Sequence, residues 1–102
     1  MADIAEATLL SAINNWTEKL KVEKNFSENT LEAYKSDLNG FLIFLKDHLG
    51  YPPGFTDFKN LTMVDIRAYL AERSSKGLKR SSTARSMSAL KNFFGYLEVN
   101  GL

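Results

Sequence analysis

Apolar side chains recur at helical spacing in four segments of this 102-residue chain, and no segment shows the strict alternation of a half-buried strand. In the first segment, four apolar residues follow one another at intervals of four, three and four, so they share one face of a helix. These residues are Leu9, Ile13, Trp16 and Leu20. The same test predicts helices near residues 8–24, 28–49, 63–76 and 82–98. The chain is therefore predicted to fold as one compact all-α domain of four helices.

Polar residues and glycines mark the expected helix ends. Small hydroxyl residues that can accept hydrogen bonds from free backbone amides are predicted to begin three of the helices. They are Ser27, Thr62, and Ser81 or Ser82. Thr62 and Asp65 have the spacing of a capping box. Gly50, Lys76-Gly77 and Asn100-Gly101 are predicted to end helices.

Four further large apolar residues are assigned to the core. Phe55 and Phe58 follow the stiff connector 51–54 and are expected to plug the core from a loop. Met63 and Met87 are expected to fill gaps between helices.

Residue counts exclude several classes of site. The chain has no cysteine and one histidine, His48, which rules out thiolate chemistry and a His-based zinc cluster; His48 is expected to be a surface residue. The carboxylates are spread singly along faces expected to be exposed, so no acid–base pair is apparent. No cofactor is expected, and the domain by itself is not expected to be an enzyme.

The length of the apolar runs and the charge near the N-terminus argue against membrane insertion and secretion. No apolar run approaches the length of about 18 residues needed to cross a bilayer. The first charged residue, Asp3, is acidic, whereas a secretory signal would start with a basic segment. An intracellular protein is expected.

The net charge of +1 is distributed unevenly along the chain. Residues 1–73 carry a net charge of −3, whereas residues 74–97 carry +5 and contain no acid. A basic segment in a mildly acidic domain suits a polyanion that binds one side of the molecule. A solvated helix face with charges of one sign would look the same by composition alone.

Within this basic segment, polar side chains form a band on the predicted helix 82–98. At 100° per residue, four of them lie within about 60° of one another, opposite the apolar arc. They are Ser81, Arg85, Ser88 and Asn92, with Lys91 beside them and Lys79 and Arg80 at the helix entry. Small hydroxyls among long cations allow close approach to a phosphate backbone. Free amides at Ser82 and Thr83 would add a phosphate site.

The predicted helix 28–49 offers a second, smaller set of candidates near its start. Thr30 and Lys35 flank the apolar arc and could contact phosphate, whereas Tyr34 lies on the arc itself. A tyrosine in that position is typical of the edge of a core, with its hydroxyl at the surface.

Two runs of the sequence resemble the N-terminal core-binding domain of tyrosine recombinases, and of the bacterial Xer type most closely. The first is Ser27-Glu28-Asn29-Thr30-Leu31 with Tyr34, Asp37-Leu38 and Phe41. The second begins at residues 65–73 and 76–78, and continues with Ser82, Ala84-Arg85, Ser88-Ala89-Leu90, Phe93-Phe94 and Tyr96-Leu97. The resemblance covers roughly residues 9 to 101.

This resemblance implies a SAM-like domain, spanning residues 1–102, that binds duplex DNA at one arm of a recombination site. It implies DNA contacts from two helices, made by Thr30, Tyr34, Lys35, Lys79, Arg80, Ser81, Ser82, Arg85, Ser88 and Lys91. The family's catalytic residues belong to a second domain that is absent from this sequence. Expected partners are that catalytic domain and other protomers of a synaptic tetramer.

The resemblance also implies a cellular role and leaves alternatives open. The role is site-specific recombination that resolves chromosome dimers during chromosome partition and cell division, in a bacterial cytoplasm at the nucleoid. One alternative is a phage or integron integrase with the same fold, acting in DNA integration. The other is a helical protein–protein module whose basic face is incidental and whose partner occupies an exposed apolar groove.

Overall fold

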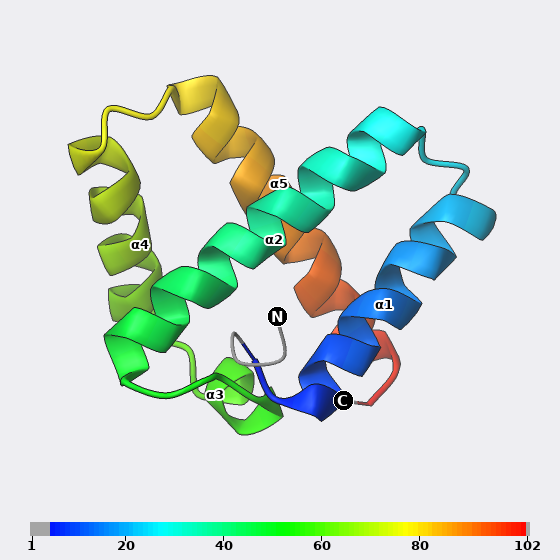
Figure 1. The fold of residues 1–102 in the computed structure, drawn as a ribbon, viewed down its shortest axis with the longest axis horizontal. Helices are drawn as coiled ribbons and strands as arrows, with labels where there is room; N and C mark the ends of the chain where they lie inside the picture. Colours follow the sequence, from blue (N-terminus) through cyan, green and yellow to red (C-terminus); the bar gives the residue numbers. More distant parts are fainter. Residues whose placement is uncertain (1–4, 102) are drawn as a thin grey trace.

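Five α-helices make up the part of the chain that the computed structural model describes, residues 5–101 (Figure 1). They are α1 (Ala7–Val22), α2 (Glu28–Leu49), α3 (Phe55–Lys59), α4 (Met63–Ser75) and α5 (Arg80–Val99). The all-α prediction is confirmed, with one more helix than expected. Residues 1–4, on which the argument against a secretory signal depends, lie outside the described residues.

The two longest helices, α2 and α5, cross near their middles and form the centre of the fold (Figure 1). Helix α1 packs against both of them, and α4 lies on the other side of the crossing. From the crossing, the N-terminal halves of α2 and α5 run to the same edge of the molecule, the upper edge in Figure 1. The positive ends of both helix dipoles therefore lie along one edge.

The core lies where these helices meet, and aromatic rings fill much of it. Trp16 and Phe93 are fully buried and meet edge to face at 5.1 Å between ring centroids. Phe41 contacts several aromatic rings, listed here: Phe44, Phe58, Tyr69 and Phe94. The predicted apolar arcs of α1, α2 and α5 are confirmed by the burial of Leu9, Leu38 and Leu90.

Two of the predicted helix starts are confirmed and one is wrong. The Ser27 hydroxyl accepts from the Thr30 amide at 3.2 Å, and Thr62 and Asp65 form the predicted capping box of α4. Helix α5, however, begins at Arg80, with Lys79 as its N-cap residue, rather than after Ser81 or Ser82. The Lys79 side chain has no acceptor atom and therefore cannot cap the helix.

The predicted loop between α2 and α4 contains the short helix α3. The Gly54 amide donates to the Asp57 carboxylate at 2.9 Å, and the Tyr51 hydroxyl donates to the same carboxylate at 2.6 Å. The first bond satisfies a free backbone amide at the start of α3, and the second holds the Asp57 carboxylate in place. Phe58 is buried from this helix, so the prediction of a core residue is confirmed although the prediction of a loop is wrong.

Met63 does not fill the core as predicted. It is the first residue of α4, and it is 65% exposed. Helix α4 packs through Ile66 and Tyr69 instead, and Tyr69 lies about 120° around the helix from Met63. Met87 is partly buried against the core, as predicted.

Loss of the Asp65 carboxylate is expected to change how stability depends on pH. The amide of Thr62 donates to Asp65, and this bond, helped by the hydrogen bond from His48, holds the pKa of the carboxyl below its ordinary value. A lowered native pKa means that the stabilisation is present above about pH 4 and is lost as pH falls through the native pKa. Asp65→Asn should therefore be less stable than wild type near pH 6, with a difference that shrinks toward about pH 2.5. Urea denaturation at both pH values measures this, and a difference independent of pH would contradict it.

Candidate nucleic-acid interface

An ion pair with a buried carboxylate and a half-exposed guanidinium joins α2 to α5 where the two helices cross. The Nε and Nη2 atoms of Arg85 donate to the two carboxylate oxygens of Asp37 at 2.8 and 2.9 Å. The Ser86 hydroxyl donates to the same carboxylate at 3.0 Å. Asp37 and Ser86 are buried, whereas 49% of the Arg85 side chain is exposed. A carboxylate from one helix thus fixes a guanidinium on the other in a two-pronged geometry.

This pair corrects two predictions made from the sequence. The basic segment contains no acid of its own, but the fold places Asp37 beside Arg85, so part of the positive charge is balanced there. Asp37 is also a buried carboxylate rather than one on an exposed face. The hydrogen bond and charge of Asp37 raise the pKa of the Arg85 guanidinium above its ordinary value. The pair therefore favours the charged guanidinium further, while the Arg85 side chain remains half exposed.

The outer face of α5 is exposed and rises little above the helix backbone. Ser81 and Ser88 are exposed on the same face, two turns apart, and Lys91 follows one turn after Ser88. Ala84 and Gly95 are exposed on this face as well. A surface of small side chains with a few cations lets another molecule approach the helix closely.

Positive charge gathers at the N-terminus of α5. Lys79 and Arg80 are exposed there, Ser82 is half buried, and the first turn contains no acid. Because α5 begins earlier than predicted, the Thr83 amide is not free: it donates to the Lys79 carbonyl at 3.0 Å. The expected phosphate site at this end must therefore shift toward the first amides of the helix, those of Arg80, Ser81 and Ser82.

Arg73 of α4 brings a further cation to this end, which the sequence prediction missed. Its Nε donates to the Thr83 hydroxyl at 2.9 Å, and its guanidinium lies over the Tyr69 ring at 5.8 Å from the centroid. Arg73 lies ten residues before Thr83 in sequence, in the last turn of a separate helix. Its position at the end of the predicted helix 63–76, close to the basic segment, is the signal that could have identified it.

Asn92 leaves the predicted polar band and faces inward. Its side-chain oxygen accepts from the Trp16 indole nitrogen at 2.9 Å, and the residue is half buried. The indole N–H of a buried tryptophan needs such a partner. The band on the outer face of α5 is therefore Ser81, Ser88 and Lys91, with Arg85 at its flank.

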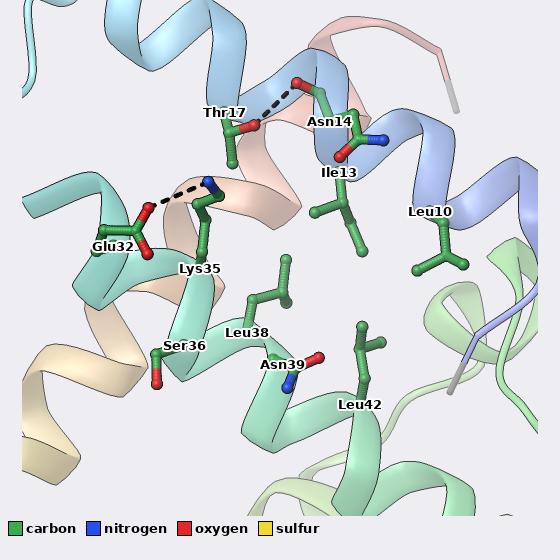
Figure 2. A pocket seen from close by; sticks show the side chains of 10 residues that line it. All are labelled: Leu10, Ile13, Asn14, Thr17, Glu32, Lys35, Ser36, Leu38, Asn39 and Leu42. Atoms are coloured by element: carbon green, nitrogen blue, oxygen red, sulfur yellow. Dashed lines mark hydrogen bonds and ion pairs between the residues drawn. The ribbon is translucent and has the colours of Figure 1, made fainter. Parts of the chain in front are cut away.

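The three candidates on α2 point in different directions. Thr30 is exposed two turns before Asp37 on the same face of α2, and its hydroxyl lies 2.9 Å from that of Ser27. Tyr34 is half buried and stacks on Trp16 at 6.4 Å, the core-edge position described above. Lys35 lies about 140° around the helix from Thr30, on the side facing α1. It pairs there with Glu32 at 3.3 Å (Figure 2).

That side of α2 forms one wall of a groove whose other wall is α1 (Figure 2). The groove has a volume of about 510 Å³. Its floor is apolar, formed by Leu10, Ile13, Leu38 and Leu42, and polar side chains such as Lys35 line its rim. The groove lies away from the outer face of α5, so the domain has two separate candidate surfaces.

The remaining polar groups suggest no metal centre. His48 is exposed, as predicted, and its Nε2 lies 3.1 Å from Asp65. Across residues 5–101, no group of three or more histidine, aspartate or glutamate side chains could hold a metal ion. Within the same range, no helix is both long and apolar enough to cross a bilayer.

Comparisons with known proteins point to one family. The family model described as the phage integrase N-terminal SAM-like domain matches residues 13–101. Relatives named tyrosine recombinase XerC are 37% identical over 98 residues in Brucella suis biovar 1, and 36% over 91 residues in Rhodospirillum centenum. Another, from Lacticaseibacillus casei, is 39% identical over 88 residues.

These matches cover most of the chain but only part of each relative. They span 96%, 89% and 86% of this chain, and 31%, 27% and 28% of the three relatives, respectively. The chain is therefore similar to less than a third of each of these proteins. Among solved structures, none gives a significant match.

Proposed function

Because the chain belongs to the phage integrase N-terminal SAM-like domain family, we propose that it is the DNA-binding core-binding domain of a Xer-type tyrosine recombinase. The observation that carries the proposal is the exposed face of α5, which bears Ser81, Ser88 and Lys91 and has only small side chains between them. It is reinforced by the cations at the start of the same helix.

In the proposed binding mode, α5 lies in the major groove of duplex DNA. Lys79, Arg80, Lys91 and the first amides of α5 meet the phosphate backbone, and Arg85 and Ser88 face the groove. Thr30 approaches the backbone from α2, which reaches the same edge of the molecule (Figure 1). Tyr34 and Lys35 stay in the proposal with smaller roles, because one packs on Trp16 and the other faces α1.

The domain is proposed to bind DNA without cutting it. Residues 1–102 form a single binding domain in this proposal, and catalysis belongs to a further domain of the parent protein. Its proposed partners are duplex DNA, that catalytic domain and the other protomers of a synaptic tetramer. The proposed role is chromosome dimer resolution at the nucleoid, in the bacterial cytoplasm.

The proposal predicts salt-dependent binding of duplex DNA. About five phosphate contacts, each contributing about 0.9, give a slope near −4 to −5 when log affinity is plotted against log salt. Removing three exposed cations with Lys79→Gln, Arg80→Gln and Lys91→Gln should reduce the magnitude of the slope to about 2. Fluorescence anisotropy with a labelled duplex at several salt concentrations measures both slopes.

A matched control removes the same charge elsewhere. Lys21, Lys24 and Lys59 are exposed and lie outside α5, so replacing all three with glutamine should leave the slope near the wild-type value. An equal reduction in both triple variants would show that net charge, rather than the α5 face, determines binding. No dependence of the wild-type affinity on salt would overturn the proposal.

The groove between α1 and α2 supports a second candidate function, that of a protein–protein module. Its apolar floor could receive the apolar face of a partner helix. In that case Ile13→Glu would abolish partner binding, and the wild-type chain would show no salt-dependent binding of duplex DNA.

The names of the relatives favour a Xer recombinase over a phage or integron integrase, which would share the DNA-binding face and differ in its target site.

A further inference from the structure

We infer that Asp37 is a positioning residue for DNA binding, which holds the Arg85 guanidinium in the orientation that the DNA meets. This inference rests on the proposed function, and it assigns a binding role to a buried carboxylate on the helix opposite to Arg85. The basis is the two-pronged contact, in which Arg85 Nε and Nη2 donate to separate oxygens of Asp37.

The geometry of the guanidinium determines what remains available for a ligand. The group is planar and carries five N–H donors. Asp37 takes two of them along one edge, which leaves three donors, two on Nη1 and one on Nη2, fixed in the same plane. Because 49% of the side chain is exposed, these donors can be reached from outside. A phosphate oxygen or a base edge in the groove would therefore meet an arginine whose orientation is already set.

Asp37 is itself fixed, which makes it suitable for this role. Its carboxylate is buried at the crossing and also accepts the Ser86 hydroxyl, so it cannot follow Arg85 if the guanidinium turns. An unpaired exposed arginine would sample many rotamers and would lose that freedom on binding. The pair fixes Arg85 before DNA arrives.

Whether Asp37→Asn raises or lowers the affinity for DNA distinguishes a positioning role of Asp37 from a simple effect of its charge. Asp37 is an acid next to the proposed DNA face, so on charge alone Asp37→Asn should strengthen binding of a polyanion. Positioning predicts the opposite result. The asparagine amide would place N–H donors against Arg85 Nε, remove one of the two hydrogen bonds and release the guanidinium. We expect Asp37→Asn to lower the affinity for duplex DNA about tenfold, within the range of coupling between contacting charged residues.

The experiment measures duplex affinity by anisotropy for wild type, Asp37→Asn, Arg85→Lys and the double variant. Lysine retains the charge of Arg85 but cannot form the two-pronged contact. Arg85→Lys should therefore lose about as much affinity as Asp37→Asn, and the double variant should lose no more than either single variant. Two independent losses that add in the double variant would overturn the inference.

Two controls separate positioning from charge and from stability. Asp47→Asn removes an exposed acid from the same helix and should leave affinity unchanged or slightly raised. Leu97→Ala creates a cavity near the far end of α5 and should lower the midpoint of thermal unfolding while affinity at 15 °C stays unchanged. An additional readout is the Arg85 Nε–H resonance, which should exchange slowly with water in wild type and rapidly in Asp37→Asn.

The outcomes are distinguishable from those that test the proposed function. If wild type binds with the expected dependence on salt and Asp37→Asn binds as well or better, the positioning role is wrong and the proposed function stands. If wild type shows no salt-dependent binding, both are overturned.

Discussion

Phe41→Ala is expected to lower the free energy of unfolding by about 3–5 kcal/mol, the usual cost of removing a buried aromatic side chain. Phe41 has no exposed surface and lies among aromatic rings from three other helices, at centroid distances of 5.0 to 6.4 Å. These neighbours belong to α3, α4 and α5 as well as α2, so they cannot all close on the space left behind. Domains of this size have a total stability of about 5–15 kcal/mol.

Urea denaturation followed by circular dichroism measures the loss, as a lower midpoint with an unchanged slope. The control is Val64→Ala, which truncates an exposed residue of α4 and should change stability by less than about 0.5 kcal/mol. A loss below about 1 kcal/mol for Phe41→Ala would mean that the aromatic cluster is not the centre of the core.

Arg85→Ala is expected to cost about 2–3 kcal/mol of stability, although the side chain is half exposed. The variant leaves the buried Asp37 carboxylate without its cation and with one hydrogen bond, from Ser86. Removing one partner of a fully buried pair costs about 3–5 kcal/mol. We place the value for Arg85 lower because water can reach the site that the guanidinium leaves.

The control for this second result is Lys91→Ala, which removes the same charge from an exposed position on α5 and should cost less than about 0.5 kcal/mol. Adding Asp37→Asn to Arg85→Ala should restore part of the lost stability, since the buried charge is then gone. Thermal and urea unfolding of the four proteins measure these differences. Equal stability of Arg85→Ala and Lys91→Ala would show that the pair contributes nothing at the crossing.

The four longer helices could be predicted from the sequence because each repeats its apolar residues over several turns. Helix α3 could not, because five residues make barely more than one turn and show no period. It forms because Asp57 accepts the Gly54 amide, while Phe58 is held in the core by contacts with residues far along the chain. The sequence places the start of α5 too late, because serine is a good N-cap residue whereas the helix extends back to Arg80.

The candidate site was predictable only where it depends on one helix. Ser81, Ser88 and Lys91 share an exposed face because the spacing of residues along a helix determines it. The partner of Arg85 lies 48 residues earlier, and that of Asn92 lies 76 residues earlier, so no local pattern could indicate either. Lys35 was grouped with Thr30 by proximity in sequence, whereas the helix turns it toward α1.

The ion pair between Asp37 and Arg85 has a consequence for how the domain would dissociate from the proposed DNA ligand. Dissolved ions weaken attraction between surface charges but have little influence on a pair shielded from solvent on one side. Raising ionic strength should thus detach the protein from a nucleic acid long before it loosens the angle between its two main helices. Dissociation from DNA and unfolding would then occur at different salt concentrations. The dissociated domain would keep the arrangement of α2 and α5 that binding requires.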